Sequence, residues 1–219
     1  MKKALAFLMA AVMLMSMLTA CGNKDNADKK DNNDVNTEET DKAAADKVAA
    51  LIDAIYVQER TEETDAQCEA AKAAWDALTD AQKALVEGEE ASPDYFGLDT
   101  GDASKDDPRN QDEIGEKELL VVSFGTSFND SRVADIKSIE DALQEANPDW
   151  SVRRAFTAQI IINHIQARDG EKIDNMEQAL ERAVANGVKQ LVVQPTHLMH
   201  GAESVSYTHL RAHETCADL

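Results

Sequence analysis

Two continuous apolar runs, at residues 119–122 and 191–193, constrain the fold of this chain most strongly. Runs of this kind, bounded by small or polar residues, are typical of parallel strands that are buried on both faces. The stretch between them has helical periodicity in three places and includes one more short strand. The predicted elements are helices over 131–146, 159–167 and 175–185 and a strand over 151–156. This alternation predicts an α/β fold, in which helices flank a parallel sheet.

The apolar residues of the first two helices predict which face each helix turns toward the sheet. In the first helix these are Val133, Ile136, Ile139, Ala142 and Leu143. In the second they are Ile161, Ile162 and Ile165. His164 lies within the second helix, and we expect it to be structural or exposed rather than a ligand.

Residues 1–21 predict a secretory signal rather than a part of the fold. Lys2 and Lys3 precede an apolar run, and Leu-Thr-Ala-Cys follows, ending at Cys21. These four residues resemble the bacterial lipobox, which implies a lipidated Cys21 and a protein anchored on the outer face of the cytoplasmic membrane. The apolar run is shorter than the roughly 20 residues that span a bilayer, which disfavours an uncleaved membrane helix.

The residues that follow the signal are polar and strongly acidic. Residues 22–42 contain one large apolar side chain, Val35, so we expect a disordered tether that cannot offset the entropy of ordering. The whole chain carries 42 acidic and 22 basic residues, a net charge of -20. This excess of negative charge argues against nucleic acid as a partner.

Residues 43–87 predict a small helical hairpin, which we call the helical module. Trp75 and Tyr56 are expected in its core. The segment WDALTDAQKALV is similar to short helical modules of Gram-positive surface proteins, which act as spacers or interaction modules. Residues 88–115 are rich in Asp, Gly and Pro and predict a solvated acidic linker, since their aspartates do not match a calcium-binding loop. The α/β domain then occupies residues 116–204.

Polar side chains follow both apolar runs of the α/β domain. The second run ends at Pro195 and is followed by His197, His200 and Glu203. Ligands of open α/β sheets bind beyond the carboxyl ends of the strands, where imidazole and carboxylate suit a divalent metal or a proton relay. After the first run, the loop 123–127 offers backbone N–H groups and hydroxyls to an anion. It has neither a Walker pattern nor GxGxxG, which disfavours a nucleotide site.

Three segments of the α/β domain together resemble one protein family. They are LLVVSFGTSFND from residue 119, VRRAFTAQIII and RDG between residues 152 and 170, and LVVQPTHLMHGAE from residue 191. In order and spacing they resemble the amino-terminal half of the anaerobic sirohydrochlorin cobaltochelatases, which are class II chelatases. The resemblance implies two similar α/β halves facing each other across a cleft. In such enzymes a divalent metal enters a tetrapyrrole without ATP, as a step of cobalamin biosynthesis.

The resemblance also implies roles for individual residues. Glu203 and His197 match family positions at the end of the third strand and are implied as the catalytic groups. His197 is also a candidate metal ligand, as is His200, although the family usually has an apolar or small residue at the latter position. The loop residues implied in tetrapyrrole binding are Ser123, Phe124, Gly125, Thr126 and Ser127. The metal is a substrate, Co²⁺ with Ni²⁺ or Fe²⁺ left open, and no permanently bound cofactor is expected.

The sequence departs from the family after Glu203. In these chelatases the histidines that chiefly ligate the metal belong to the second half, in a Gly-His-Gly strand end and a Gly-Asp-His turn, and this chain has neither motif. Residues 205–219 look like translated sequencing-adapter DNA, so we expect a non-native tail and reject His209 and His213 as a metal pair. On this interpretation the chain is a fragment that does not complete the cleft alone.

Two other functions remain open from the sequence. A lipid-anchored, extracytoplasmic protein that binds or delivers a tetrapyrrole or a metal, without chelatase turnover, suits the predicted membrane location, because sirohydrochlorin is made in the cytoplasm. A surface adhesin-like protein would act through the helical module instead. Assembly into a homo-oligomer is also left open.

Overall fold

A computed structural model describes residues 32–197 and residue 201 of the chain. Its first part contains α2 (Asn32–Ile55), α3 (Thr64–Asp76), α4 (Asp80–Lys83), α5 (Asp94–Gly97) and the 3₁₀ turn η2 (Ala103–Lys105). The α/β domain contains β1 (Lys117–Ser123), α6 (Asn129–Ser131), the π-helical segment η3 (Arg132–Lys137), α7 (Ser138–Ala146), β2 (Ser151–Phe156), α8 (Gln159–Asp169), α9 (Met176–Ala185) and β3 (Gln190–Pro195). The predicted signal with Cys21, the site residues His200 and Glu203, and the tail 205–219 lie outside the described residues. The described helices include none with the length and apolar character needed to cross a membrane.

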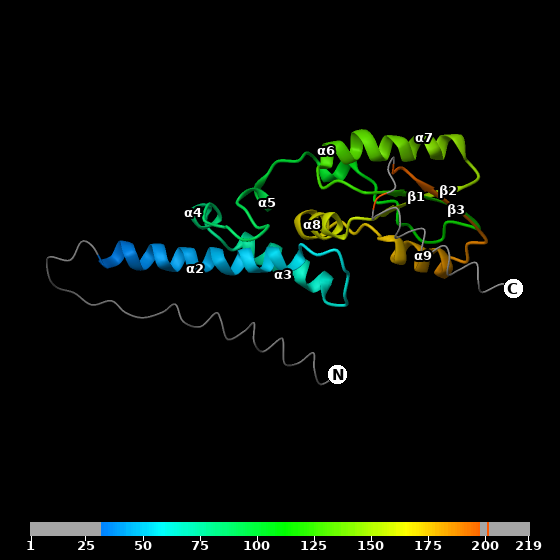
Figure 1. The fold of residues 1–219 in the computed structure, drawn as a ribbon. Helices are drawn as coiled ribbons and strands as arrows, with labels where there is room; N and C mark the ends of the chain where they lie inside the picture. Colours follow the sequence, from blue (N-terminus) through cyan, green and yellow to red (C-terminus); the bar gives the residue numbers. More distant parts are fainter. Residues whose placement is uncertain (1–31, 198–200, 202–219) are drawn as a thin grey trace. The chain divides into compact units, whose positions relative to one another are not determined.

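The three strands form one parallel sheet in the order β2-β1-β3 (Figure 1). Leu120 of the central strand β1 pairs with Arg153 of β2 on one side and with Val193 of β3 on the other. Helix α9 covers one face of the sheet, where Met176 packs into a core with Leu120. Helix α7 covers the opposite face, where Leu143 packs against residues of β1 and β2. The predicted α/β fold, with helices flanking a parallel sheet, is confirmed.

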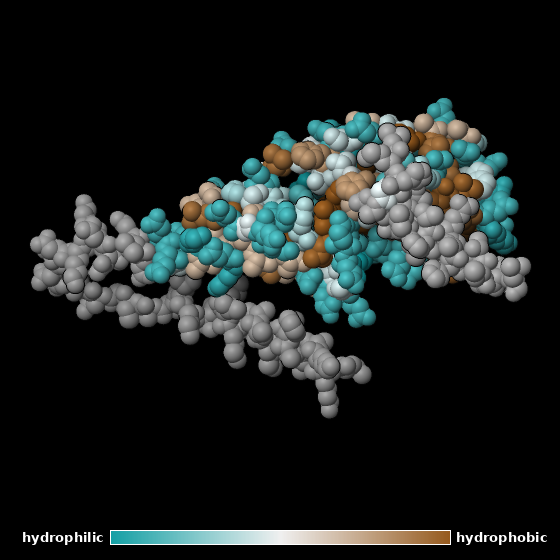
Figure 2. Space-filling model, in the orientation of Figure 1, coloured by the Kyte–Doolittle hydropathy of each residue, from teal (hydrophilic) through white to brown (hydrophobic). Residues whose placement is uncertain are grey.

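The apolar run of β3 predicts a strand that is buried on both faces. The structure shows that only one face of β3 is buried. Leu191 and Val193 pack on the side of α9, but Val192 points to the other face and is 46% exposed. The core beneath α7 contains residues of β1 and β2 and none of β3. Hydrophobic residues therefore reach the surface of the α/β domain, as Figure 2 shows. The large ones exposed there are Phe124, Phe128, Ile139, Val184 and Val192.

The face that the first helix of the α/β domain turns inward agrees with the prediction only in part, because Ile136 and Leu143 pack against the core as expected but Ile139 and Ala142 do not. Arg132 and Glu140 are fully buried, whereas Ile139 and Ala142, both predicted to face the sheet, are exposed. The π-helical segment η3 explains the difference, because its wider turn shifts the residues that follow out of the α-helical phase. The buried face therefore carries charged residues, which need partners elsewhere in the fold.

The helical module forms its own core and shares it with the α/β domain. Trp75 is buried there with residues of α2 and α3, as predicted, but Tyr56 is 39% exposed, so its predicted place in the core is wrong. The same core includes Ala167 of α8. Asn163 of α8 ties the two parts together, because its side chain donates to the carbonyl of Ile55, 2.8 Å away. The module is therefore packed against the α/β domain through α8.

The predicted tether at residues 22–42 is also shorter than expected. Helix α2 begins at Asn32, so residues 32–42 are helical, while residues 22–31 lie outside the described part. Residues 37–40 are exposed, which agrees with their polar composition. A polar, acidic sequence of this kind is compatible with an exposed helix as well as with a disordered chain.

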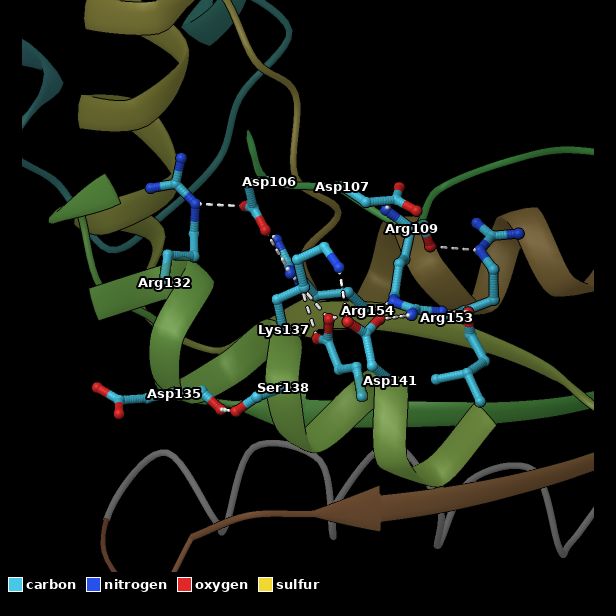
Figure 3. Close-up of polar contacts among 12 residues, drawn as sticks. Asp106, Asp107, Arg109, Arg132, Asp135, Lys137, Ser138, Asp141, Arg153 and Arg154 are labelled. Atoms are coloured by element: carbon cyan, nitrogen blue, oxygen red, sulfur yellow. Dashed lines mark hydrogen bonds and ion pairs between the residues drawn. The ribbon is translucent and has the colours of Figure 1, made fainter. Parts of the chain in front are cut away.

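The predicted acidic linker at residues 88–115 is not solvated but folded into the structure. Tyr95 and Phe96 of α5 join the core of the helical module. Further along, the carboxylate of Asp106 lies between Arg132 and Arg154, with oxygen-to-nitrogen distances of 2.6 and 2.7 Å (Figure 3). All three side chains are fully buried. The linker prediction is wrong because composition alone does not reveal the buried arginines that these aspartates meet.

Candidate functional site at the strand ends

The carboxyl ends of the three strands meet at one edge of the sheet. The amide of Thr157, just after β2, donates to the carbonyl of Ser123 at the end of β1, 2.9 Å away. The amide of Thr196, just after β3, donates to the carbonyl of Val122, also at 2.9 Å. These bonds bring the segments that follow β1, β2 and β3 together. This is the edge at which ligands bind in open α/β sheets.

His197 is held across this edge by the segment after β2. Its Nε2 lies 3.2 Å from the hydroxyl of Thr157, and the tautomer of the imidazole decides which atom donates. The side chain is half-buried at this edge. The structure thus places the predicted catalytic histidine where two strands converge.

The loop 123–127 adopts a conformation that depends on glycine. Gly125 has a φ of +99°, and a Cβ added to it would lie 2.5 Å from the ring of Phe156. A side chain at this position would therefore be strained twice, by its backbone and by a core aromatic ring. The tight approach leaves Phe124 projecting outward, 44% exposed. An exposed aromatic ring at a ligand-binding edge offers a flat apolar surface to a planar molecule.

Two arginines fix the second half of the loop. Arg168 donates to the carbonyl of Ser127 at 2.7 Å, and Arg132 donates to the carbonyl of Thr126 at 3.3 Å. Both guanidinium groups also bind the side-chain oxygen of Asn129, at 3.1 and 2.7 Å. Four of the five loop residues have buried or half-buried positions, with Phe124 the exposed one. The loop is therefore rigid before any ligand arrives, which reduces the entropy lost on binding.

Sequence reasoning did not select Thr157, Arg132, Arg168 or Asn129 as site residues. Thr157 lies within the segment that carries the family resemblance, but a lone threonine after a strand has no distinctive pattern. The sequence did indicate that this fold buries arginines, because the predicted strand β2 contains Arg153 and Arg154. Two buried guanidinium groups need carboxylates as partners. The acidic segment 88–115, which precedes β1, could have been expected to provide them.

Within the described residues, no three His, Cys, Asp or Glu side chains come close enough to hold a metal ion. Of the residues predicted to contact metal, only His197 is described. An imidazole beside a hydroxyl is also an arrangement that enzymes use for proton transfer. The edge as described can therefore contact a planar ligand, a metal and a proton.

His164 has a structural role, as expected. Its ring stacks on that of Tyr95, with centroids 4.3 Å apart and an angle of 10° between the planes. Burial and, to a smaller extent, the positive charge of Arg168 lower the pKa of His164 to about 4. The imidazole is neutral at physiological pH and belongs to the contact between α8 and α5.

The carboxyl group with the most unusual titration in this domain lies at the opposite end of β1. Glu118 is fully buried, and neither of its carboxylate oxygens has a hydrogen-bond partner among the described residues. Burial raises the pKa of Glu118 from 4.5 to about 7, although the charge of Arg153 opposes this. Because Glu118 lies at the start of its strand, away from the strand-end site, we assign the shift to structure rather than to catalysis.

Glu118 should make the stability of the fold depend on pH. Its raised pKa means that the folded chain binds more protons than the unfolded chain between about pH 4.5 and pH 7. The free energy of unfolding should therefore fall by up to about 3 kcal/mol as the pH rises through this window. Urea unfolding at pH 5 and pH 8 measures this difference, and Glu118→Gln should reduce it. Glu116→Gln, an exposed neighbour, should leave it unchanged; an equal effect of both variants would contradict the assignment.

Comparisons with known proteins match the part of the chain that carries this site. Residues 117–212 match the cobalt chelatase (CbiK) family. The sirohydrochlorin cobaltochelatase of Salmonella typhimurium (strain LT2) is 41% identical over 88 residues, which cover 40% of this chain and 33% of that enzyme. The resemblance predicted from the sequence is confirmed over this segment. The matched segment spans about a third of the length of the relative, and it begins after the helical module.

Proposed function

We propose, from the match of residues 117–212 to the cobalt chelatase family, that the α/β domain forms one wall of a metal-insertion cleft. The reaction would be the ATP-independent insertion of Co²⁺ into sirohydrochlorin or a related tetrapyrrole, a lyase reaction of cobalamin biosynthesis. The observation that carries this proposal is the convergence of His197, Thr157 and the preformed loop at one strand edge.

The loop 123–127 is proposed to bind the macrocycle. Its exposed Phe124 would lie against the flat face of the ring, because aromatic surfaces stack favourably on planar ligands. Thr126 and Ser127, which are half-buried, would direct polar groups toward the rim of the ring, while Gly125 allows the close approach of the backbone. Ser123 is buried, so it would support the loop from beneath. The tetrapyrrole would therefore be positioned by shape before the metal arrives.

His197 is proposed to contact the incoming metal or to take up a proton from the ring. Metal insertion displaces two pyrrole N–H protons, so the site needs groups that accept protons near neutral pH. Glu203 is proposed as a second proton acceptor, and His200 as a further metal ligand. Both lie outside the described residues, so their assignment rests on the sequence. Ni²⁺ and Fe²⁺ remain alternative metals, because imidazole and carboxylate suit all three ions.

Replacing His197 by alanine should lower kcat/KM for cobalt insertion by about 100-fold, the usual scale for losing a proton-transfer group. The assay mixes sirohydrochlorin and Co²⁺ with the protein from the complete reading frame and follows the tetrapyrrole absorbance. Gln194→Ala is the matched control, because Gln194 is exposed on the same strand end. An unchanged rate in His197→Ala would remove this residue from the site. Tight tetrapyrrole binding without insertion in the unsubstituted protein would overturn the enzymatic function in favour of delivery.

We also propose that the protein is attached to the membrane through a lipid on Cys21, at the extracytoplasmic face. The proposal is supported by the lipobox-like sequence that ends at Cys21. Growth of the producing cells with a labelled fatty acid should label the protein, and Cys21→Ser should abolish the label. Label that persists in Cys21→Ser would contradict the anchor.

A further inference from the structure

The connection between α2 and α3 reaches the strand-end site from outside the α/β domain. The side-chain oxygen of Gln58 accepts a hydrogen bond from the backbone amide of Gln159, 3.2 Å away. This amide is the first of α8, and the preceding residue Ala158 has no side-chain oxygen that would cap the helix. Gln58 therefore supplies, from the helical module, a capping contact that the α/β domain lacks.

Gln58 binds Gln159, which belongs to the turn between β2 and α8. The same turn contains Thr157, the partner of His197. Thr157 lies two positions before Gln159 and contacts the imidazole. The turn is held on its other side by β1, because the amide of Ala158 donates to the carbonyl of Phe124 at 3.3 Å. The side-chain oxygen of Gln159 also accepts a hydrogen bond from the side-chain amide of Asn175, 2.9 Å away. The turn thus lies between the module, β1 and the start of α9.

A groove of about 420 Å³ beside this turn is lined by both parts of the chain. Arg60, Thr61 and Glu62 come from the module, and the other lining residues come from the first turns of α9 and its cap: Asn175, Glu177, Gln178 and Glu181. In Figure 1 the α2–α3 connection lies on the side of the α/β domain where α9 begins. The module therefore borders the edge of the domain at which the candidate site lies, in addition to packing against α8.

We propose that Gln58 is a positioning residue for the strand-end site, which holds the β2–α8 turn so that Thr157 meets His197. The use of this contact in metal insertion rests on the proposed function. The effect of Gln58 on the contact between Thr157 and His197 does not. The match to the cobalt chelatase family begins at residue 117, so Gln58 lies outside the matched segment. The helical module is on this account a working part of the site rather than a spacer.

The test compares two near-isosteric variants, Gln58→Leu and Gln58→Glu. Leucine removes the acceptor, whereas glutamate keeps an oxygen for the amide of Gln159 and adds a charge that favours a helix N-terminus. In Gln58→Leu, the amide of Gln159 should exchange with solvent about five-fold faster, as expected for the loss of one net hydrogen bond. The ring signals of His197 in the NMR spectrum should also move. Both changes should be absent in Gln58→Glu.

Gln82→Leu provides the matched control within the module. Gln82 closes the capping box of α4 and binds Asp41, with no contact to α8 among those described. It should leave the signals of His197 in place. Equal shifts in Gln82→Leu and Gln58→Leu would overturn the proposal, because the effect would then follow general loosening of the module. Unmoved His197 signals in Gln58→Leu would overturn it as well.

A kinetic readout separates this proposal from the proposed function. If both hold, Gln58→Leu lowers kcat for cobalt insertion and Gln58→Glu restores it. If the ring signals of His197 move in Gln58→Leu while the unsubstituted protein inserts no metal, the positioning role of Gln58 is supported and the chelatase function is contradicted. If insertion occurs and is indifferent to Gln58→Leu, the chelatase function stands and the positioning role is removed.

Discussion

Replacing Asp106 by alanine should lower the free energy of unfolding by about 3–5 kcal/mol, because it leaves two buried guanidinium groups without their shared carboxylate. Asp106 binds Arg154 through both of its oxygens, at 2.7 and 2.9 Å, and Arg132 through one, at 2.6 Å. Arg132 also donates to the carbonyl of Thr126 in the loop 123–127. The substitution should therefore weaken both the fold and the site. Chemical denaturation monitored by circular dichroism measures the first effect.

The matched control for Asp106 is Asp102→Ala in the same segment. Asp102 caps the short turn η2 and is exposed, so its removal should destabilise the fold far less than the removal of Asp106. A similar small loss in Asp106→Ala would contradict the account, since it would mean that the segment is solvated after all.

The contribution of Asp106 should also disappear in acid. Burial alone would raise its pKa, but the hydrogen bonds and charges of Arg154 and Arg132 outweigh this and hold the pKa of Asp106 below its usual value. The contribution of Asp106 to the free energy of unfolding is therefore fully present above the ordinary pKa of an unfolded aspartate. It is lost as the pH falls through the lower pKa that Asp106 has in the folded state.

Replacing Gly125 by valine should abolish tetrapyrrole binding and lower the free energy of unfolding by about 2–5 kcal/mol. The positive φ of Gly125 disfavours a β-branched residue, and the added carbons would meet the ring of Phe156 at the end of β2. Relief of this clash requires movement of either the loop or the core. Both outcomes displace the surface that Phe124 is proposed to offer.

Gly170→Ala is the control for Gly125→Val, because it separates backbone strain from the clash. Gly170 also has a positive φ, +71°, but no atom of the described residues lies within 4 Å of the position of an added Cβ. Its substitution should cost about 1–2 kcal/mol and leave binding intact. Equal stability losses in the two variants would show that Phe156 does not restrict the loop.

The sequence predicted the elements whose signal is local. Continuous apolar runs identified β1 and β3, and the polar residues that follow these runs selected His197 and the loop 123–127 as candidates for a site. The burial of β3 was not predictable in the same way, because a run of branched aliphatic residues is compatible with an edge strand as well as with a central one. What covers a strand depends on its neighbours, which no local pattern encodes.

The folded segment 88–115 shows a second limit of local reasoning. Its aspartates, glycines and prolines are typical of a solvated linker. Asp106 is nevertheless buried, because Arg132 and Arg154 become its partners only when β2 and the preceding helix are in place. The π-helical segment η3 adds to the difficulty, since it turns Arg132 and Glu140 inward where periodicity predicts Ile139. The residues that hold the candidate site in place were therefore harder to predict than the position of the strand ends.

Titration of metal-free sirohydrochlorin into the protein, followed by absorbance, tests most directly whether the strand-end edge is one wall of a tetrapyrrole cleft. The comparison includes Phe124→Ser and the neighbouring Phe128→Ser, two variants of aromatic residues with similar exposure, 44% and 49%. The account predicts saturable binding to the unsubstituted protein, clear weakening in Phe124→Ser and nearly unchanged affinity in Phe128→Ser. Absence of saturable binding, or equal weakening in both variants, would contradict it.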